Sequence, residues 1–340
     1  MVNKSTSYTI DQIADAAGVS KATVSRVMNG TANVSKDKQR IVEQTIKRLG
    51  FEPNPNARKL AGGSAGSIAL VLEESTEEFF LNPFWKDVVT GFISETSKSK
   101  LHPVLFFHSK DDEDRDLINA LVRGNYDAVA IFGWHRDIRI LETYIPERMT
   151  VVFGGKQGES TRFTYVGVDN IEGGSMATRH LIDIGAEKIL TITGDLTVES
   201  GRERLAGYKK ALTEAGHKFQ ESRVLKGDYS QESAIKALRT YLSKTQDFDA
   251  IFAANDLMAI GAMKVLKEFK LDVPGKIKVI GFDGTELAAS HIPALSTISQ
   301  PSLELGKQVA KNLVSVTKKK KIADISLTMN LISRASTQTK

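Results

Sequence analysis

Cysteine is absent from this 340-residue sequence. Its absence excludes disulfide bonds, catalysis by a thiol and metal sites with cysteine ligands. The sequence also has no run of about 18 apolar residues, the length that a membrane-spanning helix needs, and its first residues, MVNKSTSYTIDQ, lack the apolar core of a signal peptide. Together these absences favour a protein of the reducing cytoplasm.

Motifs for catalysis are also missing. The stretch GGKQGES at 154–160 lacks the spacing and the Lys-Ser/Thr ending of a phosphate-binding loop. The stretch GGSAG at 62–66 resembles a nucleophile elbow in its letters, but no strand precedes it. The six histidines are scattered and include no helical pair of the kind that binds zinc. We therefore expect no enzyme activity, no metal and no cofactor.

An excess of positive charge is confined to the beginning of the chain. Residues 1–64 hold 10 Lys and Arg against 5 Asp and Glu. The whole chain holds 46 against 41, which leaves 36 of each sign beyond residue 64. A basic segment on a neutral body is typical of a module that binds a polyanion such as DNA, although a solvated basic face would have the same composition.

Three short helices are predicted within this basic segment. Thr9 and Gln12 form a capping box at the start of the first helix, and Gly18 ends it. Ser20 caps a second helix, Lys21 to Met28, and Val34 and Ser35 open a third. The residues that we expect to face the core are Ala22, Val24, Val27 and Met28 in the second helix and Ile41, Val42, Thr45, Ile46 and Leu49 in the third.

The spacing of small residues predicts a helix-turn-helix. Ala14 lets the first two helices approach, Gly18 makes the turn and Val24 fills the space between them. The second helix then enters the DNA major groove by its N-terminal end. Its Ala22 cannot hydrogen-bond a base, so we expect readout to depend on Lys21, Arg26 and a contact with a thymine methyl group. The candidate DNA contacts are Thr9, Ser20, Lys21, Ala22, Thr23, Ser25, Arg26, Asn29, Asn33 and Ser35. A generic three-helix bundle is the alternative.

The stretches TIDQIADAAGVSKATVSRVMNG and VSKDKQRIVEQTIKRLGFEPNPNARKL resemble the start of the lactose-repressor (LacI/GalR) family of bacterial transcriptional regulators, and the resemblance continues to the C-terminus. It implies a helix-turn-helix DNA-binding domain at 1–50, a hinge helix and linker at 51–65 and an effector-binding domain at 66–340.

The hinge has its own composition. Asn54 and Pro55 can start a helix over residues 56–61 that Gly62 and Gly63 end, but so short a helix is not stable alone. The resemblance implies that two copies pair on DNA, where Leu60 wedges into the minor groove and Ala57 lies at the helix contact. Arg58 and Lys59 are expected to add phosphate contacts. An ordinary Gly/Ser linker is the alternative.

The remainder of the chain alternates short apolar runs with amphipathic stretches. The runs are SIALVL, HPVLFF, AVAIFG, TVVFGG, KILTITG, AIFAAND and IKVIGFDG. This βαβ pattern predicts an α/β fold with parallel sheets, in two lobes with a ligand between them. The resemblance extends to periplasmic sugar-binding proteins and implies three crossings between lobes, near 168–170, 295–298 and 322–325. The N-lobe is then about 66–168 and 298–322, and the C-lobe about 169–297 and 323–340. The KKKK run at 318–321 is expected to be a solvated helix end.

Polar and aromatic residues follow several predicted strands. An arginine fork and a carboxylate can bracket vicinal hydroxyls, and aromatic faces cover the apolar side of a sugar or base ring. By the resemblance, Arg204, Asn255 and Asp283 match the main polar effector contacts, Phe84 and Tyr229 match ring-packing positions, and Trp85 adjoins them. Arg202 and Asp256 are expected to be structural.

The sequence is therefore interpreted as that of a DNA-binding transcriptional regulator, a homodimer or tetramer on a near-palindromic operator, and a repressor by the resemblance. A small molecule, most simply a sugar, controls it. A nucleoside or purine effector and a protein co-regulator are alternatives, and a transport-type sugar-binding protein is a further one. Whether the effector is an inducer or a co-repressor is left open.

Overall fold

The computed structural model describes residues 8–28, 34–51, 66–99, 101–109, 111–124, 126–157 and 162–338. The chain divides into two units, residues 1–66 and residues 67–340, and each is described by itself. The predicted hinge at 51–65 lies outside the described residues except for Phe51.

The first unit contains three helices, α1 (Ile10–Ala17), α2 (Lys21–Met28) and α3 (Lys36–Leu49). The capping box is confirmed, because the Thr9 backbone N–H donates to Gln12 Oε1 at 2.8 Å and the Gln12 backbone N–H donates to Thr9 Oγ1 at 3.3 Å. Gly18 adopts a φ of +63°, a left-handed conformation that glycine reaches without cost, so the chain can turn sharply into α2.

A small core joins these helices. Ile13 and Ala14 of α1, Val24 of α2 and Val42 of α3 are buried together. Ile41 is 43% exposed, contrary to expectation, because it lies about 100° round the helix from Val42 and outside the buried stripe. Ala22 was also expected in the core and is exposed.

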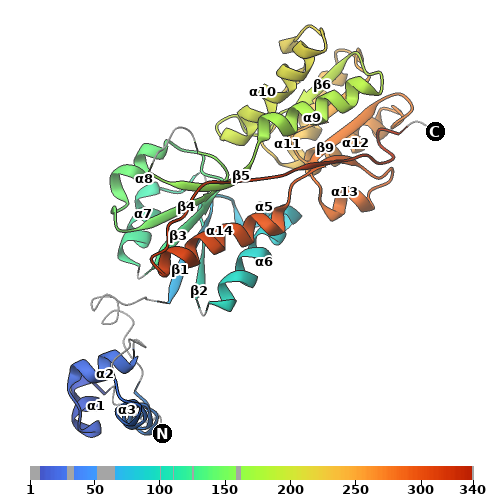
Figure 1. The fold of residues 1–340 in the computed structure, drawn as a ribbon. Helices are drawn as coiled ribbons and strands as arrows, with labels where there is room; N and C mark the ends of the chain where they lie inside the picture. The colour runs from blue at the N-terminus through green and yellow to red at the C-terminus, as the bar shows by residue number, and fades with distance from the viewer. Residues whose placement is uncertain are drawn as a thin grey trace, which may run out of the picture. The chain divides into compact units, whose positions relative to one another are not determined.

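Two parallel-rich sheets build the second unit (Figure 1), which confirms the predicted fold class. The first sheet has the order β11-β5-β4-β3-β1-β2. Its strands are β1 (Ser67–Leu72), β2 (His102–Phe107), β3 (Ala128–Phe132), β4 (Thr150–Gly154), β5 (Thr164–Val168) and β11 (Ile325–Leu327). The helices of this first lobe are α5 (Thr76–Leu81), α6 (Pro83–Lys98), α7 (Asp114–Arg123), α8 (Ile138–Tyr144) and α14 (Ser302–Thr317).

The second lobe repeats this plan. Its sheet has the order β12-β10-β9-β8-β6-β7, and all its strand pairs are parallel except β10 with β12. The strands are β6 (Ile189–Ile192), β7 (Val224–Leu225), β8 (Ala250–Ala253), β9 (Lys278–Asp283), β10 (Ser296–Ser299) and β12 (Asn330–Ile332). The helices are α9 (Asn170–Asp183), α10 (Glu199–Glu214), the 3₁₀ turn η1 (Glu221–Arg223), α11 (Gln231–Leu242), α12 (Asp256–Glu268) and α13 (Glu286–Ser290).

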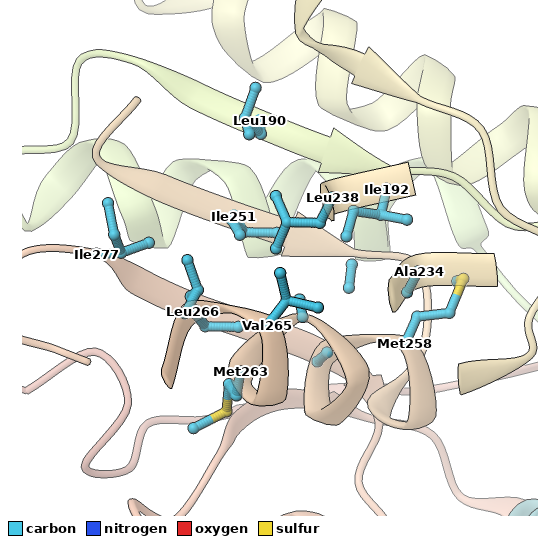
Figure 2. Packing of buried hydrophobic residues seen from close by; sticks show 14 of the residues in the cluster. Leu190, Ile192, Ala234, Leu238, Ile251, Met258, Met263, Val265, Leu266 and Ile277 are labelled. Carbon is cyan, nitrogen blue, oxygen red and sulfur yellow. The ribbon is translucent and has the colours of Figure 1, made fainter. Parts of the chain in front are cut away.

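Both faces of each sheet are covered by helices, as parallel strands require. In the second lobe, Leu190 and Ile251 of the sheet face Leu238 of α11 and Leu266 of α12, all fully buried (Figure 2). The continuous apolar runs of the sequence are thus explained, because strands buried on both faces need no polar alternation.

The chain passes between the two sheets three times. The first passage runs from Val168 at the end of β5 to Asn170 at the start of α9. The second follows Ser299 and the third follows Leu327, so both lie later in the chain than the expected 295–298 and 322–325. The reason is that β10 completes the second sheet and β11 completes the first, and neither short strand was predicted.

Helix α14, late in the chain, belongs to the first lobe and packs closely against α6. A Cβ on Gly306 of α14 would lie 1.9 Å from the Val88 carbonyl oxygen of α6, and one on Gly91 would lie 2.0 Å from the Leu303 carbonyl oxygen. Only glycine fits at both positions, so the two helices pack backbone to backbone. The lysines 318–321 follow α14 and are exposed, which confirms the expected solvated helix end.

Candidate functional site

A cavity of about 140 Å³ lies between the lobes of the second unit, beside the carboxyl ends of strands from both sheets. We call it the inner pocket. All six residues that the sequence predicts as effector contacts line it: Phe84, Trp85, Arg204, Tyr229, Asn255 and Asp283. The first two come from α6 of the first lobe and the others come from the second lobe, so the inner pocket needs both lobes.

Arg204 and Asp283 form the charged centre of the inner pocket. Arg204 Nη1 lies 3.8 Å from Asp283 Oδ1, and both side chains are buried. The guanidinium carbon lies 3.8 Å from the centroid of the Phe282 ring, and Arg204 Nε donates to Asn170 Oδ1 at 3.0 Å. These contacts fix the guanidinium in one orientation, so that it can present its remaining N–H groups to a ligand hydroxyl.

Burial has the largest effect on the pKa of the Asp283 carboxyl. Loss of water raises the pKa of its carboxyl to about 7, the Arg204 charge opposes this rise and the Asp256 charge adds to it. The carboxyl also accepts a hydrogen bond of 2.7 Å from Gln300 Nε2. A group with this pKa is both a hydrogen-bond donor and an acceptor near neutral pH, and it can therefore satisfy a hydroxyl in either direction.

Two residues of the inner pocket have an unusual backbone. Tyr229 has a φ of 74° and Asp283 a φ of 114°, a region that side chains other than glycine rarely adopt. The Tyr229 hydroxyl is held by the Ser200 hydroxyl at 2.9 Å, and its ring fits only because residue 194 is glycine. Strained backbone of this kind costs about 1–3 kcal/mol and persists where function needs the geometry.

An aromatic wall closes the first-lobe side. The Phe84 and Trp85 rings meet edge to face with their centroids 5.1 Å apart. Asn82 and Pro83 start helix α6 here, with the Asn82 side chain accepting from the Phe84 backbone N–H at 3.1 Å. The sequence NPFW therefore starts helix α6 and places its two aromatic residues, Phe84 and Trp85, in the lining of the inner pocket.

Glu74 joins this wall from the end of β1. It accepts a hydrogen bond of 3.3 Å from Trp85 Nε1. Burial raises the pKa of the Glu74 carboxyl to about 8, and the neighbouring Glu78 contributes to the rise by a side-chain hydrogen bond and by its charge.

Asn255 also has a structural role. It is the N-cap of α12, with Oδ1 accepting from the Met258 N–H at 2.9 Å, and its Nδ2 donates to the Tyr229 carbonyl at 2.9 Å. The side chain thereby holds Tyr229 in its strained conformation. One amide hydrogen of Nδ2 remains for an effector.

The structural roles expected of Asp256 and Arg202 are confirmed. Asp256 is fully buried and accepts hydrogen bonds from Thr285 and Thr297. Arg202 pairs with Glu199 and donates to the carbonyls of the loop before α10.

Sequence reasoning missed several polar residues that line the inner pocket, namely Glu73, Glu74, His135, Lys156, Gln157, Asn170, Ser200 and Gln300. Glu74 follows the predicted strand SIALVL and could have been found by the strand-end rule. Asn170 and Gln300 follow β5 and β10, strands that the sequence did not reveal.

The inner pocket opens into a wider cavity of about 710 Å³, which we call the outer chamber. Both are lined by Glu73, Glu74, Asn82, His135 and Tyr229, so they are continuous. Within the described part of the chain, no group of three or more histidine, aspartate or glutamate side chains is arranged to hold a metal ion. No helix among those residues has the length and apolar character that a membrane crossing requires.

The candidate DNA contacts of the first unit lie mainly on α2. Lys21, Ala22 and Arg26 are exposed, and Thr23 and Ser25 are half-buried. The Ser20 hydroxyl accepts from the Thr23 N–H at 3.2 Å and so caps the helix. Thr9 and Ser35 are exposed at the starts of α1 and α3, although the Ser35 side chain makes no capping bond. Asn29, Asn33, Ala57, Arg58 and Leu60 lie outside the described residues.

Comparison with known proteins agrees with this architecture. Residues 9–54 match the family described as "Bacterial regulatory proteins, lacI family", and residues 178–337 match a "Periplasmic binding protein-like domain". The chain is 34% identical to the HTH-type transcriptional regulator CelR of Thermobifida fusca, over 90% of this chain and 91% of that protein. It is 31% identical to the HTH-type transcriptional repressor PurR of Photobacterium profundum, over 92% of each chain.

Solved structures give the same result. A complex of the transcriptional regulator CelR with cellobiose has a TM-score of 0.76 at 32% identity and covers 97% of this chain and 99% of that chain. The lac repressor dimer bound to operator and an anti-inducer has a TM-score of 0.80 at 25% identity and covers 98% of this chain and 100% of that chain. The chain therefore belongs to the LacI family of DNA-binding transcriptional regulators.

Proposed function

We propose that this regulator is a cytoplasmic repressor that binds a near-palindromic operator as a homodimer, and that a sugar in the inner pocket controls its operator affinity. The observation that carries the sugar proposal is the joint placement of Arg204, Asp283 and the aromatic wall in one cavity between the lobes. A ligand that contacts both lobes changes their relative orientation, and a coupling of about 1–3 kcal/mol is enough to change operator affinity several-fold to a hundred-fold.

The chemistry of the inner pocket supports a sugar. Arg204 offers a cation and Asp283 a carboxyl group to adjacent hydroxyl groups, and Asn255 adds an amide. The rings of Phe84 and Trp85 offer an apolar surface on the other side. The CelR complex with cellobiose is a relative of the same architecture, which adds support.

A nucleoside or purine is the second candidate. The aromatic side chains of the inner pocket suit a base as well as a sugar ring. A protein co-regulator is the third, and a well-formed polar pocket favours a small molecule over it.

The DNA-binding proposal has its own support. The predicted contacts Lys21, Ala22 and Arg26 are exposed on one short helix whose N-terminus is capped by Ser20. The contribution of the hinge residues Ala57, Arg58 and Leu60 remains part of this proposal.

Thermal-shift measurements test the effector class. The panel contains monosaccharides, disaccharides, sugar phosphates, nucleosides and purines, and a ligand at about 100 times its dissociation constant should add about 2.7 kcal/mol to the free energy of unfolding. We expect a saccharide to stabilise the protein and the shift to be lost in Asp283→Asn, which keeps the size of the side chain. Asp183→Asn, an exposed position on α9, is the matched control. Stabilisation by nucleosides or purines alone would refute the sugar proposal.

A further inference from the structure

The inner pocket is small for an effector site. Ligand-binding pockets typically enclose about 300–1,000 Å³. The inner pocket, at about 140 Å³, falls below this range, whereas the outer chamber of about 710 Å³ lies within it. Because Glu74, Asn82 and Tyr229 belong to the lining of both, a ligand that leaves the inner pocket on this side enters the outer chamber directly.

The outer chamber is lined by carboxylates from both lobes. Glu77, Glu78 and Asp111 come from the first lobe, and Asp195, Asp228 and Glu232 come from the second. Among the described residues, neither lysine nor arginine lines it. Carboxylates are strong acceptors for hydroxyl groups, so this lining suits a polyhydroxylated ligand without charge.

The positively charged side chains of the inner pocket do not offset the negative charge of the outer chamber. Arg204 is already engaged by Asp283, by Asn170 and by the Ala254 carbonyl. Lys156 lines the edge of the pocket and is exposed. A phosphate or carboxylate on the ligand would therefore add negative charge to a site that has little free positive charge.

The raised pKa values of two pocket carboxyl groups also argue against an anionic ligand. Burial, with the neighbouring Glu78, raises the pKa of Glu74, and burial raises the pKa of Asp283 as well. Surroundings that keep carboxyl groups protonated near neutral pH also disfavour an anion brought in by a ligand.

We propose that the effector is a neutral saccharide of at least two rings that lies across the inner pocket and the outer chamber, and that the outer carboxylates exclude acidic and phosphorylated sugars. This inference rests on the proposed sugar effector and makes it more specific. One ring binds between Arg204, Asp283 and the aromatic wall, and the next ring donates its hydroxyls to the carboxylates at the mouth.

Isothermal titration calorimetry tests both the size and the charge of the ligand. The probes are glucose, cellobiose, maltose and lactose, together with glucose 6-phosphate and cellobiouronic acid, a carboxylate that keeps both rings of cellobiose. Adenosine and hypoxanthine complete the set. We expect one neutral disaccharide to bind at least about tenfold more tightly than glucose, the effect of one or two hydrogen bonds to charged groups. We expect cellobiouronic acid to bind at least about tenfold more weakly than cellobiose, because its carboxylate meets like charges.

A double variant isolates the outer carboxylates. Glu77→Gln with Glu232→Gln removes two exposed charges, one from each lobe, and keeps the side-chain size. We expect it to weaken the best disaccharide and to reduce the preference for cellobiose over cellobiouronic acid, with glucose affinity unchanged. Glu147→Gln with Glu187→Gln, two exposed positions outside both cavities, is the control and should change none of these affinities.

The outcomes separate this inference from the proposed function. Glucose binding as tightly as every disaccharide would remove the outer chamber from the site, and cellobiouronic acid binding as tightly as cellobiose would refute the charge argument. Either result would still agree with a regulator that is controlled by a sugar. Binding of adenosine or hypoxanthine alone, or no binding by any saccharide, would overturn the sugar effector together with this inference.

Discussion

Individual residues of the inner pocket are held in states that a folded protein normally avoids. Tyr229 and Asp283 have a positive φ, and burial raises the pKa of Asp283 and of Glu74. Each of these features lowers the stability of the folded chain. Their concentration at one cavity is the reason to assign function there, because packing alone does not require strained backbone or buried carboxyls.

The raised pKa of Glu74 predicts a pH dependence of stability. Between its ordinary value of 4.5 and about 8 the unfolded chain ionises this carboxyl while the folded protein retains the proton, so the free energy of unfolding falls as the pH rises through this window. Glu74→Gln removes the titration. We expect the melting temperature of the variant, relative to the unmodified protein, to rise by at least about 5 °C from about pH 5 to about pH 8.

Differential scanning calorimetry at several pH values measures this difference. Glu77→Gln, which neutralises an exposed neighbour, should give a difference that does not depend on pH in the same way. A constant offset for Glu74→Gln across the whole window would contradict the prediction, because it would mean that Glu74 is ionised in the folded protein.

On α2, the helix that we propose to contact DNA, one residue carries a prediction about specificity. Lys21 is exposed at the start of α2, with Nζ 3.0 Å from Asp11 Oδ2 across an exposed ion pair of little energetic value. Its ammonium is therefore available to a guanine. We expect Lys21→Ala to weaken binding to the preferred operator by about tenfold and to reduce discrimination between half-site variants.

Fluorescence anisotropy with an operator obtained by in vitro selection, and with single-base variants of it, measures both effects. Lys36→Ala, at the exposed start of α3, is the comparison. An equal loss of affinity for every half-site variant would identify Lys21 as a phosphate contact only.

At the scale of elements, the charged centre of the inner pocket is bonded to the segments where the chain changes lobes. Arg204 Nε donates to Asn170 at the first crossing, and Gln300 at the second crossing donates to Asp283 both from its side chain at 2.7 Å and from its backbone N–H at 3.0 Å. An effector that engages Arg204 and Asp283 thus acts on groups that also hold the crossings. This is a physical connection between ligand and lobe orientation.

Removal of the Gln300 side-chain bond should loosen the lobes. We expect Gln300→Leu to broaden the distribution of distances between the lobes without a large change in melting temperature. The native chain has no cysteine, so spin labels can be attached at cysteines introduced at exposed Lys98 and Lys244, one in each lobe, and read by pulsed electron spin resonance.

Gln308→Leu is the matched control, because Gln308 lies on α14 within the first lobe and bonds to Glu304 of the same helix. If Gln300→Leu and Gln308→Leu gave the same distance distribution as the unmodified sequence, the bond to Asp283 would have no part in lobe orientation.

At the scale of the whole molecule, the second unit has exposed apolar side chains on both lobes. Phe80 of α5 is 80% exposed, and Leu81 is 63% exposed. Ile292, after α13 in the second lobe, is 91% exposed. Large apolar side chains this exposed are candidates for an interaction site, and a related lac repressor is a dimer on its operator. A second copy of this chain is the partner that we propose for it.

Charge placed on this surface should separate the copies. Phe80→Asp with Ile292→Asp is expected to convert a dimer into monomers and to reduce operator affinity by at least about a hundredfold, because one half-site then binds without the other. Light scattering gives the mass, and anisotropy gives the affinity. Tyr144→Asp, an equally exposed aromatic on α8, is the control. A variant that remained dimeric would place the interface elsewhere.

Local sequence determined much of this protein. The capping box at Thr9, the turn at Gly18 and the spacing of Ala14 and Val24 define the first unit, because they act through neighbours in the chain. Seven apolar runs identified seven strands of the second unit, and polar residues after them, such as Arg204 and Asp283, proved to line one cavity. Strand ends meet at one edge of a parallel sheet, so this inference needs no tertiary detail.

Tertiary structure alone decided the rest. The short strands β10 and β11 are strands only because a sheet edge pairs with them, so the second and third crossings could not be located from sequence. Asn170 and Gln300 become part of the inner pocket through those crossings. The outer chamber and the raised pKa of Glu74 arise from burial between two lobes, a property of residues far apart in the chain that no local pattern encodes.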